Sequence, residues 1–332
     1  MIENITSVAT QVAILFIIIG VGVILSKCKV LNKERVSGLI DIVVYIVTPS
    51  NIIVSFQREF KGELIFNLGF SFLAAFIVFF INCVMAKIVI REKNPDKNCV
   101  IRFASAFPNA GYFALPLQKA ILGDIGVFYG AAYIGMFHCY IWTYGVKLLT
   151  KKPEKTVDSP VFSLVDKSQN RPLSSQVLAA LKKILLNPPI IGIFIGIIFF
   201  VLKIKIPNII LSPMQSFAAL NTPLPMLIIG FYLANADLKA TFSNLWVYIG
   251  AFLRLIASPA IALLICMLLK VDSGVATSCI IACSAPSAAL SGMLAQKFGR
   301  DTEVPAGMIT FTTIVCIITM PVMVALAQYL FN

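Results

Sequence analysis

Long apolar runs separated by short polar gaps dominate the hydropathy pattern of this chain. Ten runs are long enough to cross a bilayer as helices, because an α-helix rises ~1.5 Å per residue and the hydrocarbon core is ~30 Å thick. A helix is the expected form, since lipid offers no partner for backbone N–H and C=O groups. The predicted spans are 8–26, 36–56, 64–90, 99–118, 125–149, 184–202, 211–235, 245–269, 274–296 and 306–331.

The amino-acid composition excludes a soluble globular protein. Of the 332 residues, 59% are hydrophobic and 13% are charged, whereas soluble domains are ~45–50% apolar and ~25% charged. The apolar excess must face lipid, so we predict an all-α integral membrane protein whose principal partner is the bilayer. Because Glu3 and no basic residue precedes the first run, and many runs follow it, this run is predicted to be a span and not a cleaved signal peptide.

The positive charge of the chain is a topology signal. Lys and Arg number 27 against 15 Asp and Glu, a net charge of +12, and they gather in the polar gaps and at the adjoining ends of the spans. With the adjoining span ends included, the gaps after the odd-numbered spans hold 20 of them and the gaps after the even-numbered spans hold 6. The positive-inside rule therefore places the first set of gaps in the cytoplasm and both termini outside the cell. We therefore predict a multi-pass protein of the plasma membrane and no nucleic-acid partner.

Two halves of the chain resemble each other around a polar linker. Residues 150–176 have a composition that cannot bury a core, so we expect a cytoplasmic linker between a first repeat, 1–149, and a second, 177–332. Each half has five spans, an odd number, so the halves must lie upside down to one another. Such an inverted 5+5 repeat is typical of transporters, with the binding site at the bilayer midplane. The recurring positions are Asp124, Val127, Gly130 and Cys139, which match Asp301, Val304, Gly307 and Cys316.

Two predicted spans at matching positions of the halves are expected to be broken. The fourth span contains Pro108, Gly111 and Pro116, and the ninth contains Pro286 next to Ser287. Proline removes a backbone donor and its ring clashes with the preceding turn, so a helix breaks there. The N–H groups at the start of a half-helix carry partial positive charge and can bind a small carboxylate without a buried cation. The alternative is that these residues only kink the helices for packing.

Several motifs resemble those of the auxin efflux carrier family, and the likeness covers essentially the whole chain. They are Pro108–Leu117, Gly123-Asp124, Ala285-Pro286-Ser287, Phe298–Asp301, Thr48-Pro49, and Arg254-Leu255 with Pro259. The resemblance implies ten helices, of which 1, 2, 6 and 7 form a scaffold and 3–5 and 8–10 a moving domain. Helices 4 and 9 would cross at the centre, and a homodimer would form through scaffold helices 2 and 7.

The same resemblance implies a site and a substrate class. In plant members the asparagine after the helix 4 proline lies at the auxin site, and Asn109 has that position here; Ser287 follows the helix 9 proline. The long cytoplasmic loop of plant members is short here. Short members of the family are associated with malate, malonate and similar carboxylates, so we expect a carrier of small organic anions in preference to auxin, working by alternating access.

Three further polar residues in the spans are candidates with two interpretations each. Arg254 either binds the substrate carboxylate or bonds the broken backbone of helix 9. His138, the one histidine, either couples transport to protons or is a neutral histidine bonded to a helix carbonyl or to Tyr140. Asn51, two residues after Pro49, either closes the site from the scaffold or serves helix packing.

Other function classes find little support in the sequence. The sequence contains no HExxH motif, phosphate-binding loop or nucleophile elbow, so we do not predict an enzyme. One histidine cannot build a metal cluster, so we predict no metal site, and we also predict no cofactor. The eight cysteines show no paired metal spacing and are interpreted as small buried hydrophobes. Na⁺ and H⁺ both remain candidates for a coupling ion. A membrane sensor of the same fold, which binds a ligand without moving it, remains the alternative function.

Overall fold

The fold is all-helical throughout the part of the chain that the computed structural model describes, residues 2–150, 182, 184–235 and 244–331. The linker predicted at 150–176 lies outside these residues except for Thr150. The helices, with π-helical turns labelled η, are α1 (Ile2–Lys27), α2 (Lys33–Ile42), η1 (Val43–Val47), α3 (Thr48–Phe56), α4 (Gly62–Val89), α5 (Pro95–Ala106), η2 (Ala110–Ala114), α6 (Leu115–Leu122), α7 (Asp124–Tyr140), η3 (Ile141–Gly145), α8 (Val146–Leu149), α10 (Pro188–Val201), α11 (Asn208–Ala219), α12 (Pro223–Ala234), α14 (Leu245–Phe252), η5 (Leu253–Ala257), α15 (Ser258–Leu268), α16 (Ser273–Ser284), α17 (Leu290–Lys297) and α18 (Glu303–Phe331).

Seven helices of the described residues are long and apolar enough to cross a membrane. They are Ala9–Lys27, Glu34–Phe56, Gly62–Val89, Asp124–Leu149, Asn208–Ala234, Leu245–Leu268 and Glu303–Phe331. The three other predicted spans correspond to the shorter helix α10 and to the two segments that the sequence predicts to be broken. An all-helical membrane protein is therefore confirmed, while the count of ten spans stays a prediction.

The outward faces of the long helices are strongly apolar. Ile17, Leu268 and Ile318 have 68%, 73% and 72% of their surface exposed. Side chains of this kind on the outside of a helical fold require an apolar solvent. They are the surface that contacts the lipid chains.

Proline sets the position of three of the four π-helical turns found in the described residues. Each of these turns ends one residue before an Xaa–Pro pair. Because proline lacks an N–H and its ring displaces the carbonyl four residues back, the preceding turn widens to accommodate the lost hydrogen bond. The pairs are η1 before Thr48-Pro49, η2 before Leu115-Pro116, and η5 before Ser258-Pro259.

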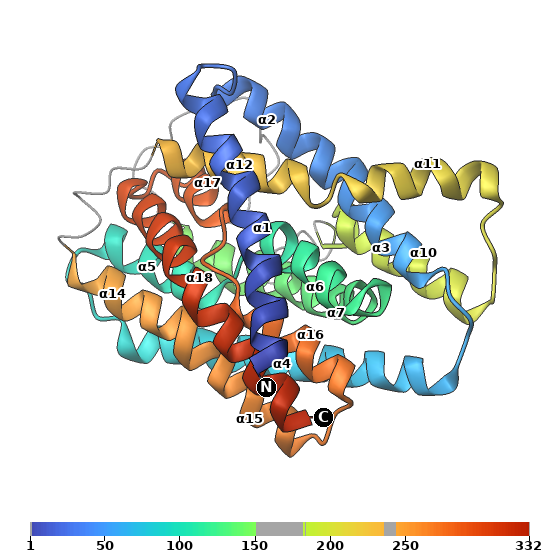
Figure 1. The fold of residues 1–332 in the computed structure, drawn as a ribbon. Helices are drawn as coiled ribbons and strands as arrows, with labels where there is room; N and C mark the ends of the chain where they lie inside the picture. Colours follow the sequence, from blue (N-terminus) through green and yellow to red (C-terminus); the bar gives the residue numbers. More distant parts are fainter. Residues whose placement is uncertain (1, 151–181, 183, 236–243, 332) are drawn as a thin grey trace.

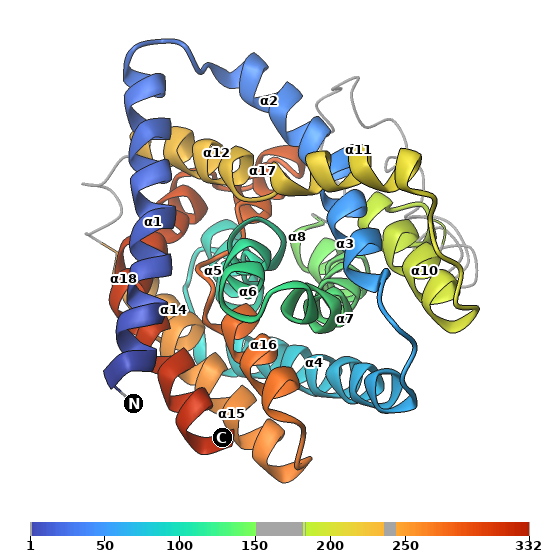
Figure 2. The same ribbon diagram turned by 45° about the vertical axis from the view of Figure 1, so that its right-hand side comes forward.

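The helices pack in two groups, and Figure 2 shows how the two groups are arranged. In the outer group (α1–α3 and α10–α12), α1 packs against α12 and α3 packs against α10 and α11. In the inner group (α4–α8 and α14–α18), α4 packs against α7 and α15, and α16 packs against α7 and α18. The groups meet mainly where α1 contacts α18 and where α7 contacts α3 and α10. The two ends of the described chain lie close together at one end of the molecule (Figure 1).

Two glycines allow the closest approach within the outer group. Gly22 on α1 and Gly230 on α12 face each other, and a Cβ added to Gly230 would lie 2.3 Å from the carbonyl oxygen of Ile19. Small residues at such contacts let membrane helices pack backbone against backbone. The α1–α12 contact therefore depends on the absence of side chains at these two positions.

We predict that Gly230→Val destabilises the protein by about 2–3 kcal/mol, because the added methyl groups overpack a backbone contact. The measurement is thermal unfolding of the detergent-purified protein. Gly20→Val on α1, the helix that Gly230 packs against, is the control, since no atom lies within 4 Å of a Cβ added at Gly20. Equal loss of stability in the two variants would contradict this account of the packing.

Candidate functional site

The candidate site is built from two interrupted helices of the inner group. Helix α5 ends at Ala106 and the chain becomes helical again at Ala110. Helix α16 ends at Ser284 and α17 begins at Leu290. The prolines that predicted the interruptions, Pro108 and Pro286, lie inside these gaps. Both are buried.

The two interruptions pair with each other through their backbones. Pro108 and Ser287 form an isolated antiparallel bridge, in which the Asn109 N–H donates to the carbonyl of Pro286 at 2.7 Å and the Ala288 N–H donates to the carbonyl of Phe107 at 3.0 Å. Unpaired backbone groups in a bilayer core cost several kcal/mol each. Each interruption therefore satisfies the groups that the other exposes.

This pairing leaves fewer backbone N–H groups free to bind the predicted anion, because several amides at the interruptions already have acceptors. Besides Asn109 and Ala288, the Ser287 N–H donates to Thr312 Oγ1 at 3.0 Å. The N–H groups of Gly111 and Tyr112, in the first turn of η2, have no backbone acceptor in the described chain. The start of η2 is thus where a half-helix presents free donors.

Open space adjoins the start of η2. A Cβ built on Gly111 would meet no atom within 4 Å, and Asn109 next to it keeps 5% of its surface exposed. Tyr112 packs against the main inner core and also against the small cluster that Val43, Ile228 and neighbouring residues form in the outer group. Asn109 and Gly111 therefore lie close to the boundary between the two groups.

Two buried hydroxyls of the second interruption have no partner in the described protein. Ser284 and Ser287 are both fully buried, and neither Oγ makes a hydrogen bond there. A buried hydroxyl without a partner is rare in native structures and commonly marks a functional position. Ser287 belongs to the site through its bridge to Pro108, so its hydroxyl adds a neutral donor next to Asn109.

Arg254 joins the C-terminal ends of both interrupted helices. It is fully buried, and its guanidinium donates to the carbonyl of Ala106 at 3.0 Å and to that of Cys283 at 2.6 Å. Nη2 also donates to Ser258 Oγ at 2.7 Å, which accepts a second hydrogen bond from Asn82 at 2.9 Å. Of the two interpretations open for Arg254, the structure favours bonding of the broken backbone, and it extends this role to α5.

The charge of Arg254 matches the helix ends that it contacts. A helix C-terminus carries a partial charge of about −0.5, so one guanidinium balances the two ends. A buried cation without such partners would be strongly destabilising. Because Arg254 is the one charged side chain among the buried residues of the described chain, the arrangement leaves no surplus charge beside the interruptions.

The other two candidates lie apart from this network. Nδ1 of His138 is buried without a hydrogen-bond partner, and the Tyr140 hydroxyl bonds instead to the carbonyl of Phe76 at 3.0 Å. Nδ1 therefore makes neither of the bonds expected for a neutral histidine, and the two interpretations of His138 stay predictions. Asn51 is buried on α3, which packs against α7, α10 and α11. No hydrogen bond joins Asn51 to the interruptions in the described part of the chain.

Sequence reasoning missed the residues that support Arg254 and Ser287. Ser258 carries a usable signal, because it lies one helical turn after Arg254 and directly before Pro259. Asn82 and Thr312 lie on α4 and α18 and carry no local signal for the bonds that they make. Their roles depend on which helices pack side by side, and a single sequence does not reveal that.

The helical membrane fold with paired interruptions in its centre is that of a membrane transport protein. A sequence profile described as "Membrane transport protein" matches residues 7–324. The chain belongs to this family, the auxin efflux carrier family that its motifs resemble. An uncharacterized transporter of Methanocaldococcus jannaschii is 24% identical over 320 residues, which cover 91% of this chain and 93% of the relative. The family is one of transporters and not of enzymes.

We predict that Arg254→Ala abolishes transport and destabilises the protein by about 2–5 kcal/mol, because it leaves buried carbonyls of two helix ends without donors. Thermal unfolding and ligand binding are measured on the same preparation. Ser258→Ala, which removes one of the hydrogen bonds to the guanidinium and no charge, should have a smaller effect. Ligand affinity retained in folded Arg254→Ala would exclude direct contact with the substrate, whereas unchanged stability would contradict the role in joining the helix ends.

Proposed function

We propose that this protein is a uniporter or secondary-active carrier of a small organic anion, a carboxylate such as malate or malonate, across the plasma membrane. The observation that carries the proposal is the pairing of the two interruptions beside the free amides of Gly111 and Tyr112. Donors of this kind bind a carboxylate by dipole and hydrogen bond, without a buried cation.

The chemistry of the interruptions favours an anion. No carboxylate is among the buried residues of the described chain, so a cationic substrate would lack a counter-ion. The neutral donors near the bridge are the η2 amides, the Asn109 side chain and the Ser287 hydroxyl. In our proposal, Pro108 and Pro286 fix the interruptions, and these donors bind the carboxylate.

We propose that the two halves form an inverted 5+5 repeat, of which the paired interruptions are the central crossing. Each half contributes one helix–gap–helix segment, α5 with α6 and α16 with α17. A second correspondence supports the repeat in the outer group. Thr48-Pro49 recurs as Thr222-Pro223, and Thr48 Oγ1 donates a long hydrogen bond of 3.5 Å to Oδ1 of Asn221, the residue before Thr222.

The two packing groups support a mechanism of alternating access. In this proposal the outer group is the scaffold, and the inner group moves against it and carries the paired interruptions as one body. The position of Tyr112, packed against both groups, supports a substrate site at the boundary that moves. The orientation with both termini outside, and a homodimer through predicted helices 2 and 7, remain predictions of the same proposal.

The direct test is uptake of radiolabelled malate, malonate and related dicarboxylates into proteoliposomes, with imposed pH and Na⁺ gradients. We expect saturable flux of at least one dicarboxylate, and the gradients identify the coupling ion. Saturable binding without flux would instead favour the sensor. Neither binding nor flux of any organic anion would refute the substrate class.

We predict that Gly111→Val weakens the apparent affinity for the transported dicarboxylate by about tenfold or more, because its side chain fills the space beside the free amides. The protein should still fold, since no atom lies within 4 Å of an added Cβ. Gly38→Val on α2, where the same space is open, is the control. An affinity equal to that of the control would place the substrate elsewhere.

If protons are the coupling ion, we propose that His138 carries the proton, and we predict that His138→Gln removes the dependence of the flux on pH near neutrality. The measurement is the rate of dicarboxylate uptake against external pH. Tyr140→Phe is the control, because its hydroxyl bonds Phe76 and not the imidazole. A pH profile unchanged in His138→Gln would rule out this role for His138.

A further inference from the structure

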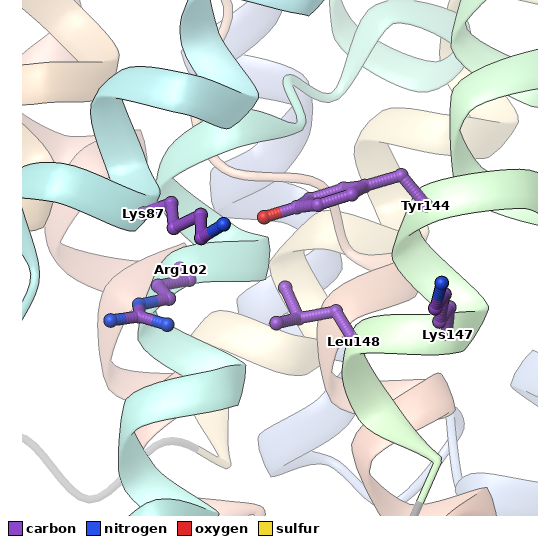
Figure 3. A pocket seen from close by; sticks show the side chains of 5 residues that line it. All are labelled: Lys87, Arg102, Tyr144, Lys147 and Leu148. Carbon is purple, nitrogen blue, oxygen red and sulfur yellow. The ribbon is translucent and has the colours of Figure 1, made fainter.

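A second cavity, built from other residues than the paired interruptions, lies between α4, α5 and the η3–α8 segment. Its volume is about 300 Å³, and Lys87, Arg102, Tyr144, Lys147 and Leu148 line it. Figure 3 shows Lys87 and Arg102 on one side and the other three residues opposite, with the Lys87 amine and the Tyr144 hydroxyl pointing toward one another. The lining thus contains three cations and no acidic residue.

These cations have no carboxylate partners in the described chain. Lys87 and Lys147 form no ion pair there, and the ion pairs of the described residues, Lys119–Asp124 and Arg300–Asp96, involve other side chains. Arg102 bonds a neutral group, since Nε and Nη2 both donate to the carbonyl of Ile90 at 3.1 and 2.8 Å. Three cationic residues therefore line one cavity without forming an ion pair among the described residues.

The helix ends nearby account for only part of this charge. Lys87 and Lys147 lie in the last turns of α4 and α8, where cations offset the partial negative charge of a helix C-terminus. Each such end carries a charge of about −0.5, so two ends balance about one of the three cations. The remaining positive charge is not balanced by these helix ends.

The position of the cavity points to a ligand at the membrane surface. Lys87 and Lys147 lie within two residues of the ends of the spans Gly62–Val89 and Asp124–Leu149. The ring of Tyr144 and the side chain of Leu148 add an apolar wall beside the charges. Cations beside apolar surface at this depth fit a phosphate group joined to an acyl-bearing backbone.

We propose that this cavity binds the phosphate group of an anionic phospholipid, with a soluble phosphate ester as the competing source of the same chemistry. Lys87 and Lys147 supply flexible charges to the phosphate oxygens, and Tyr144 supplies a hydroxyl donor. In the orientation predicted from the basic gaps, the cavity opens at the cytoplasmic leaflet, where anionic lipids are concentrated. Binding here is independent of the proposed transport of an organic anion.

The test is native mass spectrometry of the full-length protein in neutral detergent, titrated with phosphatidylglycerol or with phosphatidylcholine. We expect phosphatidylglycerol to bind more tightly, and the double variant Lys87→Gln/Lys147→Gln to lose about 30-fold in Kd, since each lysine near an anionic lipid contributes about a factor of five. Lys27→Gln/Lys93→Gln is the control, because it removes the same charge from two exposed lysines that do not line the cavity.

The source of the phosphate is distinguished by adding millimolar glycerol phosphate. Displacement of the lipid assigns the site to soluble phosphate esters, and no displacement assigns it to the lipid. Equal binding of phosphatidylglycerol and phosphatidylcholine by the wild type overturns the proposal, whether or not the variants fold. Unchanged affinity in the folded double variant, or an equal loss in the control, also overturns it.

Discussion

A backbone group inside a bilayer has no water to bond, and the centre of this protein is organised around that constraint. Two helices that stop inside the protein expose donors at one end and acceptors at the other. Here the donors and acceptors at the gaps pair across the Pro108–Ser287 bridge, and Arg254 takes the carbonyls of both helix ends. Each interruption supplies hydrogen-bond partners to the other, so they form one structural unit.

This mutual dependence has a consequence for mechanism. A network of hydrogen bonds joins α5, α16 and η5, so in the proposed mechanism the site would move together with the inner group. Most of the backbone N–H groups at the interruptions already donate hydrogen bonds within the protein, so they are not free to bind a ligand. What remains free is concentrated at Gly111 and Tyr112, where the inner group meets the outer one. The proposed substrate would therefore contact the surface that changes during alternating access.

Cations serve three different purposes in this chain, and their surroundings separate them. In the polar gaps they set topology. Arg254 is buried and balanced by helix ends, so it is structural. Lys87, Arg102 and Lys147, which also count toward the topology signal, line a cavity and form no ion pair among the described residues. A net charge of +12 gives no hint of this division, because it sums over all three.

The sequence by itself determined the membrane class, the approximate ends of seven spans and the positions where helices break, because hydropathy and proline act locally. It also marked Asn109, Ser287 and Arg254 through short motifs. Only the tertiary structure decided that the two breaks pair, that Arg254 bonds both helix ends, and that Asn82, Ser258 and Thr312 support them. These contacts join residues far apart in the chain, and the choice of neighbouring helices depends on packing that no local pattern records.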